Sequence, residues 1–406
     1  SNIGHSNPRV LAAMKLQMDK ATFAYRLHFE NEAAETLASR LAALAPAGLD
    51  RVFFVSGGSE AVESCLKLAR QYAICRGQMK RSRVISLFPS YHGSTLGAVA
   101  VTGMHQFVEP FRDMIRVMPN IPAGTCYLDH DDLTDEQRGL RYADMLRDEI
   151  LKQGPENVLA FIMEPIGGAS TGALVRPDSW YGRIAEICRE FDVLLIADEV
   201  MTGAGRTGRF FGCEHWNLRP DIMALAKGLA AGYAPLGAMI ADRKIVDAVM
   251  AHGGFAHGYT YAGNPLSCSA GLAVLDELFE QKLIGNAAQR GAILKGRLSA
   301  LMQRYPFIGH VRGKGLLLAF ELVANRDTME PLPAKLEAHV KLVEAAYERG
   351  LILYSRRTRG GTIGDHFMVC PPLIITDEQI DEVMSLLVDS LDAFANAAGL
   401  PINGSD

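Results

Sequence analysis

The run Val193-Leu194-Leu195-Ile196-Ala197-Asp198-Glu199-Val200 decides how this chain folds. Its five leading apolar residues are typical of a strand that is buried on both faces. Side chains alternate across a strand, so the two carboxylates that end the run must point to opposite faces. An acid at the carboxyl end of such a strand lies where open α/β sheets bind ligands. Considered without the rest of the sequence, however, Asp198 could equally well be a structural acid that forms a salt bridge at the strand end.

Similar runs surround this strand and indicate the fold class. Strand-like runs occur at Arg51–Val55, Arg83–Phe88, Val158–Met163, Ile222–Ala226 and Leu236–Ala241. Helical spacing of apolar residues separates them at Glu60–Cys75 and Trp180–Phe191. Continuous apolar strands that alternate with helices predict an α/β fold with a mostly parallel central sheet, covered by helices on both faces.

The chain of 406 residues is too long for one typical core, so we expect a large domain over residues 35–275 and a smaller one. A helix at Leu266–Gln281 should lead out of the large domain. Residues 276–406 predict a smaller α+β domain, on which residues 1–34 should pack. Its expected elements are helices at Ala288–Gln303, Lys335–Arg349 and Asp377–Phe394, with Thr376 as the last N-cap, and strands near Val311, at Leu316–Leu322 and at Leu351–Tyr354.

The composition excludes several classes of protein. A net charge of −5 gives no basic face for nucleic acid and no polybasic arm for anionic lipid. Apolar runs stay below the ~18–20 residues that a membrane helix needs. The seven cysteines are widely spaced without a Cys-x-x-Cys motif, which argues against a disulfide framework or a zinc site and favours a cytoplasmic protein.

A lysine ends another apolar strand, in Asp221-Ile222-Met223-Ala224-Leu225-Ala226-Lys227-Gly228. A partly desolvated lysine has a lowered pKa and can act as an imine-forming amine. A lone lysine at a strand end is more often simply solvated, but the strand-end acid Asp198 favours the interpretation of Lys227 as a reactive amine. A carboxylate held against a pyridine nitrogen keeps the ring protonated, so acid and amine together indicate pyridoxal phosphate (PLP).

Two loops supply the remaining parts of a PLP site. Phe53-Phe54-Val55-Ser56-Gly57-Gly58-Ser59-Glu60-Ala61 predicts a strand, a glycine-rich turn and a helix start, whose free N–H groups attract phosphate and whose cap could be Ser59. Ser90-Tyr91-His92-Gly93 follows another strand and offers a ring that can stack on a flat cofactor. By itself the glycine-rich turn is a moderate signal, since many α/β loops look like it, and the tyrosine loop is a weak one, since a Tyr beside Gly usually serves packing.

One motif matches the pattern of a dinucleotide-binding site, but the residues that follow it argue against such a site. Gly203-Ala204-Gly205-Arg206-Thr207-Gly208 matches G-x-G-x-x-G, but Arg209–Trp216 predicts a loop or short strand where a nucleotide site needs a helix.

Together these residues resemble the class III (ω-amino acid) aminotransferases of PLP fold type I. The resemblance covers essentially the whole chain, and its most specific part is Leu195–Gly208 with Arg219-Pro220-Asp221 and Ala226-Lys227-Gly228, 29 positions separating Asp198 from Lys227. The other matching motifs are Gly58–Ala61, Tyr91-His92-Gly93, Met163-Glu164-Pro165, Gly258–Pro265 and Pro371-Pro372-Leu373.

The resemblance implies a role for each matching residue. Lys227 would form the Schiff base and carry the proton, and Asp198 would pair with the pyridinium. The other implied contacts with the cofactor are Gly58 and Ser59 on the phosphate, Tyr91 and Val200 on the ring, His92 and Glu164 nearby, and Thr260 on the phosphate of the other subunit. The resemblance also implies a homodimer with shared sites, or a tetramer, and further residues before Ile3 that line the substrate pocket.

Two departures from the family pattern narrow the branch. Ornithine- and GABA-type members usually carry Gln where this chain has Met201, and Arg near Phe367–Cys370. The amine/ω-amino acid:pyruvate branch uses an upstream arginine instead, and Ser355–Gly361 offers three, of which Arg357 and Arg359 are our candidates for the substrate carboxylate. A solvated basic loop is the plain alternative for each one.

The leading hypothesis is a ping-pong aminotransferase that moves an amino group from an amine or ω-amino acid to a keto acid, most simply pyruvate. Another PLP reaction on this scaffold, by an aminomutase, racemase or decarboxylating transaminase, would use the same cofactor residues. A catalytically silent homologue that binds a ligand or partner would have no need for Lys227 opposite Asp198.

Overall fold

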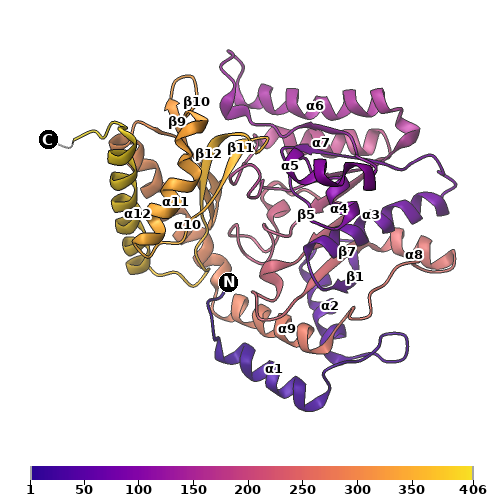
Figure 1. The fold of residues 1–406 in the computed structure, drawn as a ribbon. Coiled ribbons are helices and arrows are strands. Elements are labelled where there is room, and N and C mark those ends of the chain that lie inside the picture. Colours follow the sequence, from indigo (N-terminus) through magenta and orange to yellow (C-terminus); the bar gives the residue numbers. More distant parts are fainter. Residues whose placement is uncertain (1, 405–406) are drawn as a thin grey trace.

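The computed structural model describes residues 2–404 and divides them between two sheets (Figure 1). The larger sheet has the order β1 (Leu49–Val55), β7 (Gly237–Asp242), β6 (Ile222–Leu225), β5 (Leu194–Asp198), β4 (Val158–Met163), β2 (Arg83–Phe88), β3 (Asn120–Pro122). The strands from β6 to β3 are parallel, whereas β7 runs antiparallel to both of its neighbours. The predicted mostly parallel α/β sheet is confirmed.

Helices cover both faces because neighbouring residues of each buried strand face opposite layers. Ile196 packs with α3 (Gly58–Cys75) and α8 (Arg243–Ala251), while Leu195 and Ala197 belong to the core on the other side. That second layer contains α2 (Glu32–Leu44), α6 (Asp135–Gln153), α7 (Asp178–Glu190) and α9 (Pro265–Glu280). The short helices α4 (Leu96–Ala100) and α5 (His105–Val108) follow β2.

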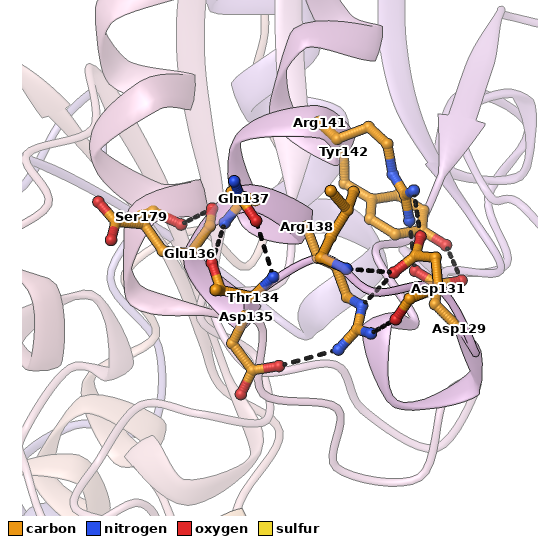
Figure 2. A network of polar contacts seen from close by, with 11 residues as sticks. Asp129, Asp131, Thr134, Asp135, Glu136, Gln137, Arg138, Arg141, Tyr142 and Ser179 are labelled. Carbon is orange, nitrogen blue, oxygen red and sulfur yellow. Dashed lines mark hydrogen bonds and ion pairs between the residues drawn. The ribbon is translucent and has the colours of Figure 1, made fainter.

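Helix α6 was not predicted, although a capping box fixes its start (Figure 2). The Thr134 hydroxyl accepts the Gln137 backbone N–H at 3.2 Å, and the Gln137 side chain accepts the Thr134 N–H at 2.9 Å. Arg141 reaches back to Asp129 at 2.7 Å, which ties the preceding loop to the helix. Because two N-terminal donors are satisfied, α6 begins at a defined residue and packs along α7.

The smaller sheet is antiparallel, with the order β10 (Glu330–Pro331), β9 (Leu317–Asn325), β12 (Ile363–Val369), β11 (Tyr354–Arg359), and β8 (Ile308–Lys314) also pairs with β9. It is accompanied by α10 (Leu283–Arg304), α11 (Ala338–Glu348) and α12 (Asp377–Ala398) (Figure 1). The capping box of Thr376 and Gln379 at the start of α12 is confirmed.

Two expectations differ from the structure. Helix α1 (Pro8–Lys20) packs along α9 rather than on the C-terminal unit, because Val10 is buried there and Arg9 pairs with Glu277 at 2.9 Å. Asn2 does reach that unit, by accepting the N–H of Leu373. The strand expected at Leu351–Tyr354 instead begins at Tyr354 and continues through the basic segment to Arg359. Polar residues suit it, because β11 is an edge strand.

Among the helices of residues 2–404, none combines the length and apolarity that a membrane span requires.

Candidate active site

A cavity of about 890 Å³ opens at the carboxyl ends of β4, β5 and β6. Its walls come from both sheets and from the start of α3. The residues from the large unit that line it include Gly58, Ser59, Tyr91, His92, Glu164, Asp198, Val200 and Lys227. The structure therefore brings together eight of the residues singled out from the sequence, at the edge where such sheets bind ligands.

Asp198 is the last residue of β5, and two hydrogen bonds hold its carboxylate. Oδ2 lies 2.8 Å from Nδ1 of the buried His92, and Oδ1 accepts the Val200 N–H at 3.0 Å. Glu199 faces away, as predicted, and accepts the N–H groups of Gly212 and Cys213, each at 2.8 Å. Asp198 therefore faces the cavity, while Glu199 stabilises the turn at Gly212 and Cys213.

Lys227 lies two residues past the end of β6 and lines the same cavity. Burial lowers the pKa of its ammonium group, while the negative charges of Asp198 and Glu164 oppose this shift. Its φ of +39° lies in a region that non-glycine residues seldom occupy and that is frequent at functional sites. A neutral amine is the form that attacks a carbonyl, so the environment favours imine chemistry.

The N-terminus of α3 forms one wall of the cavity. Gly57 is the N-cap, so Ser59 lies inside the first turn and does not cap the helix; its Oγ accepts the Ser94 N–H at 3.0 Å instead. A Cβ at Gly58 would come within 2.9 Å of Val200 Cγ1, which leaves no room for a larger residue. The exposed N–H groups and the helix dipole suit a phosphate.

Tyr91 and Glu164 complete this part of the cavity. The Tyr91 hydroxyl lies 2.8 Å from Ser94 Oγ, and its ring meets Phe107 edge-on at 5.5 Å. Glu164 follows β4 and accepts the Gly168 N–H at 2.8 Å; burial raises the pKa of its carboxyl group. Glu164 therefore braces the cavity wall behind Lys227.

The arginines do not lie as expected. Arg357 donates to the carbonyls of Thr362 and Ala334 at 3.0 and 3.1 Å, and Arg359 donates to that of Met329. Arg356, on the other face of β11, lines the cavity and stacks over Tyr354 at 4.7 Å. The alternation of side chains along an unexpected strand explains the difference.

Thr260 lies outside this cavity, on an exposed loop between α8 and α9. The G-x-G-x-x-G segment forms turns that lead to a short 3₁₀ helix at Gly212–Trp216, which agrees with rejecting a dinucleotide site.

Several lining residues were not predicted from the sequence as site residues. They are Met104, Phe107, Ala169, Ser170, Leu236, Ile352, Leu353, Tyr354, Met368 and Cys370. Most belong to loops or to the smaller sheet, for which the sequence carries no local motif. Met201 and Met368 also line the cavity, so both departures from the ornithine- and GABA-type pattern affect its wall.

The residues fit PLP as a group. The helix start can take the phosphate, Asp198 can hold a protonated ring nitrogen, and Lys227 can form the imine. Nε2 of His92 is buried at the cavity and has no hydrogen-bond partner among residues 2–404, so one further polar contact can be made there. Within the same residues, no cluster of three or more metal-binding side chains occurs.

Comparison with known proteins agrees with this chemistry. The family model "Aminotransferase class-III" matches residues 1–391. The uncharacterized aminotransferase YodT of Bacillus subtilis is 39% identical over 395 residues, which cover 97% of this chain and 88% of that protein. The putrescine–pyruvate aminotransferase of Pseudomonas aeruginosa is 36% identical, over 98% of this chain and 85% of its own length.

A solved structure gives the same result. The PLP-bound amine transaminase from an uncultivated Pseudomonas species superposes with a TM-score of 0.89 at 35% identity, covering 97% of this chain and 88% of the other. The chain therefore belongs to the class III aminotransferases, and pyridoxal phosphate is its cofactor.

Proposed function

We propose that this aminotransferase accepts the amino group of a simple amine or ω-amino acid and passes it to pyruvate by a ping-pong mechanism. The observation that carries the proposal is the character of the cavity beyond the Lys227–Asp198 pair. Met104, Phe107, Met201, Ile352 and Met368 line it, and Arg356 is the basic residue contributed by β11. An apolar wall suits an amine without a second charge near the reacting carbon.

Bound PLP supplies an electron sink for the charge that develops on the substrate carbon. Asp198, held by His92 and Val200, would keep the ring nitrogen protonated. The Lys227 amine would move the proton between the substrate carbon and the cofactor, and its burial makes the neutral base available. Gly58 and Ser59 would hold the phosphate, and Tyr91 and Val200 would confine the ring.

Arg356 is the proposed partner of the keto-acid carboxylate. A guanidinium can bind a carboxylate through two parallel hydrogen bonds. Arg356 lines the cavity, whereas Arg357 and Arg359 do not and donate to backbone carbonyls elsewhere, which favours Arg356 among the three. The P. aeruginosa relative, named for putrescine and pyruvate, supports a diamine donor and pyruvate as the first substrates to try.

The test is a spectrophotometric half-reaction with the purified PLP form. A panel should contain putrescine, other primary amines, ω-amino acids, ornithine and GABA. Bleaching of the cofactor band by amines, followed by its recovery with pyruvate but not with 2-oxoglutarate, is the expected result. A band that no donor bleaches would contradict transamination of amines and return an isomerase or decarboxylase reaction to consideration.

We also propose that a second copy of the chain covers the loop between α1 and α2. This loop and the loop before α9 lie together, since Asn264 Nδ2 donates to the Thr22 carbonyl and the rings of Phe23 and Tyr261 meet at 5.7 Å. Phe29 and Tyr261 are each 63% exposed, which is unusual for rings that stay in water. Thr260 is on the same surface, which supports its reach to the partner's cofactor.

A further inference from the structure

The wall segment Ala169–Gly172 connects the cavity to the smaller sheet. It follows β4, and two of its residues, Ala169 and Ser170, line the cavity. The Ser170 hydroxyl is buried and has no hydrogen-bond partner among residues 2–404. The position of this segment therefore decides what a ligand meets on that side.

Side chains from the smaller sheet donate hydrogen bonds to three carbonyls of the segment. Arg312 of β8 donates from Nε to Gly172 at 2.6 Å and from Nη2 to Thr171 at 3.0 Å. His366 of β12 lies with Nε2 2.9 Å from the Ala169 carbonyl. The fit is close, since a Cβ at Gly172 would come within 2.6 Å of the His366 ring.

Buried partners hold both gripping residues in place. Arg312 is 3% exposed, and Nη1 pairs at 2.7 Å with Glu321, which is fully buried. The Tyr127 hydroxyl donates to the same Glu321 oxygen at 2.7 Å, and the Arg312 guanidinium lies 4.6 Å over the Tyr127 ring. A charge pair this deep is costly to bury, so it needs each of these contacts.

The state of His366 follows from its neighbours. Burial lowers the pKa of its imidazole to about 3, so the ring is neutral and carries one proton. The Ala169 carbonyl can only accept, so the single ring proton is on Nε2, and the unprotonated Nδ1 accepts from the Thr358 hydroxyl at 2.8 Å.

We propose that His366 and Arg312 are positioning residues that hold the Ala169–Gly172 segment out of the cavity and thereby set the affinity for substrate. The residues that flank the segment, Ile166 and Ala173, are buried in one cluster with Leu317 and Ala319 of β9 and Met368 of β12. The open space lies on the cavity side. A segment released from its anchors moves into that space and narrows the cavity for bulky ligands.

The experiment compares His366→Phe, which removes the donor without changing charge, with His366→Gln, whose amide can donate from nearly the same place. Two readouts are needed. One is KM against kcat for the amine half-reaction. The other is the rate at which hydroxylamine and the larger O-benzylhydroxylamine condense with the bound cofactor, which requires no transamination.

For His366→Phe we expect KM to rise about fivefold, the worth of one lost hydrogen bond, with kcat nearly unchanged. The benzyl reagent should slow by a similar factor relative to hydroxylamine. His366→Gln should restore both values. Tyr305→Phe, which removes a buried hydroxyl contact with Asp392 in the same domain, should alter neither.

The inference rests on the proposed function only for the KM readout. If no amine reacts but the reagent ratio falls as expected, transamination of amines fails while the positioning role stands. If His366→Phe matches the wild type in reagent ratio, or His366→Gln is as impaired as His366→Phe, the role is refuted. Should His366→Phe not fold, Thr358→Val leaves Nδ1 of His366 without its donor; we then expect the same changes in both readouts, and no change in either would refute the role.

Discussion

Replacement of His92 by leucine should weaken cofactor binding by an amount that the structure bounds. His92 supplies one of the two hydrogen bonds that hold the Asp198 carboxylate, with 2.8 Å between Nδ1 and Oδ2. In the apoprotein, the Asp198 carboxylate can become protonated or rotate when the hydrogen bond from His92 is lost. A bound pyridinium requires it ionised and aligned, so the loss appears in the affinity for PLP.

A hydrogen bond to a charged group contributes about 1.5–3 kcal/mol, which corresponds to a Kd for PLP about 10- to 150-fold higher. The assay is an equilibrium titration of the apoprotein with PLP, followed by protein fluorescence. His92→Asn is the matched control, because its amide nitrogen can take roughly the place of Nδ1. A His92→Leu apoprotein that unfolds at the same urea concentration as the wild type excludes general damage.

The reasoning is wrong if His92→Leu binds PLP with a Kd within about twofold of the wild type, since the expected loss of affinity is tenfold or more. It is also wrong if His92→Asn binds PLP as weakly as His92→Leu.

Three further predictions concern other parts of the site. The rate at which the apoprotein binds PLP should rise with pH as Lys227 loses its proton, and the midpoint should lie below pH 10.5 because burial lowers the pKa of this amine. Asp198→Asn should lower this midpoint further, since the negative charge of Asp198 opposes the shift of the Lys227 pKa. Stopped-flow absorbance measures the rate for both proteins. Arg356→Ala should raise KM for pyruvate about 10- to 150-fold and leave the half-reaction with a simple amine unchanged, whereas equal effects of Arg357→Ala would contradict the assignment. The double variant Phe29→Glu, Tyr261→Glu should halve the mass measured by light scattering if a second copy covers these rings, and an unchanged mass would refute that surface.

The chemistry at the strand ends could be predicted from the sequence because each part of it is local. Asp198 and Lys227 end apolar runs, and Gly58 opens a helix after another strand, so neighbouring residues alone specify their positions. Parallel strands bring their carboxyl ends to one edge, and that places the groups together without knowledge of the tertiary contacts.

The side of the cavity formed by the smaller sheet could not be predicted in the same way. Whether Arg356 or Arg357 faces the cavity depends on β11 being a strand and on its register with β12, in which Arg357 is opposite Asp365. Ser170 and Met368 line one cavity only because the two units pack against each other. In α6, by contrast, the local signal is present, since Thr134 and Gln137 form the same capping pattern as Thr376 and Gln379, and Tyr142, Ala143, Leu146 and Ile150 are buried at helical spacing.

In the proposed mechanism, the groups that would hold the cofactor and those that would select the substrate belong to different units of the structure. Asp198 and Glu199 come from one strand, and their bonds stay within the large unit, to His92 and Val200 on one face and to Gly212 and Cys213 on the other. Arg356 and Met368, which line the far part of the cavity, belong to strands that make no hydrogen bond with the large sheet among residues 2–404. Substitutions in β11 and β12 can therefore change which amine or keto acid fits while Lys227 and Asp198 keep their geometry. The carbonyls of Ala169, Thr171 and Gly172 are the exception, since side chains of the smaller sheet donate hydrogen bonds to the large unit there, and substitutions at His366 or Arg312 should therefore change the affinity for substrate.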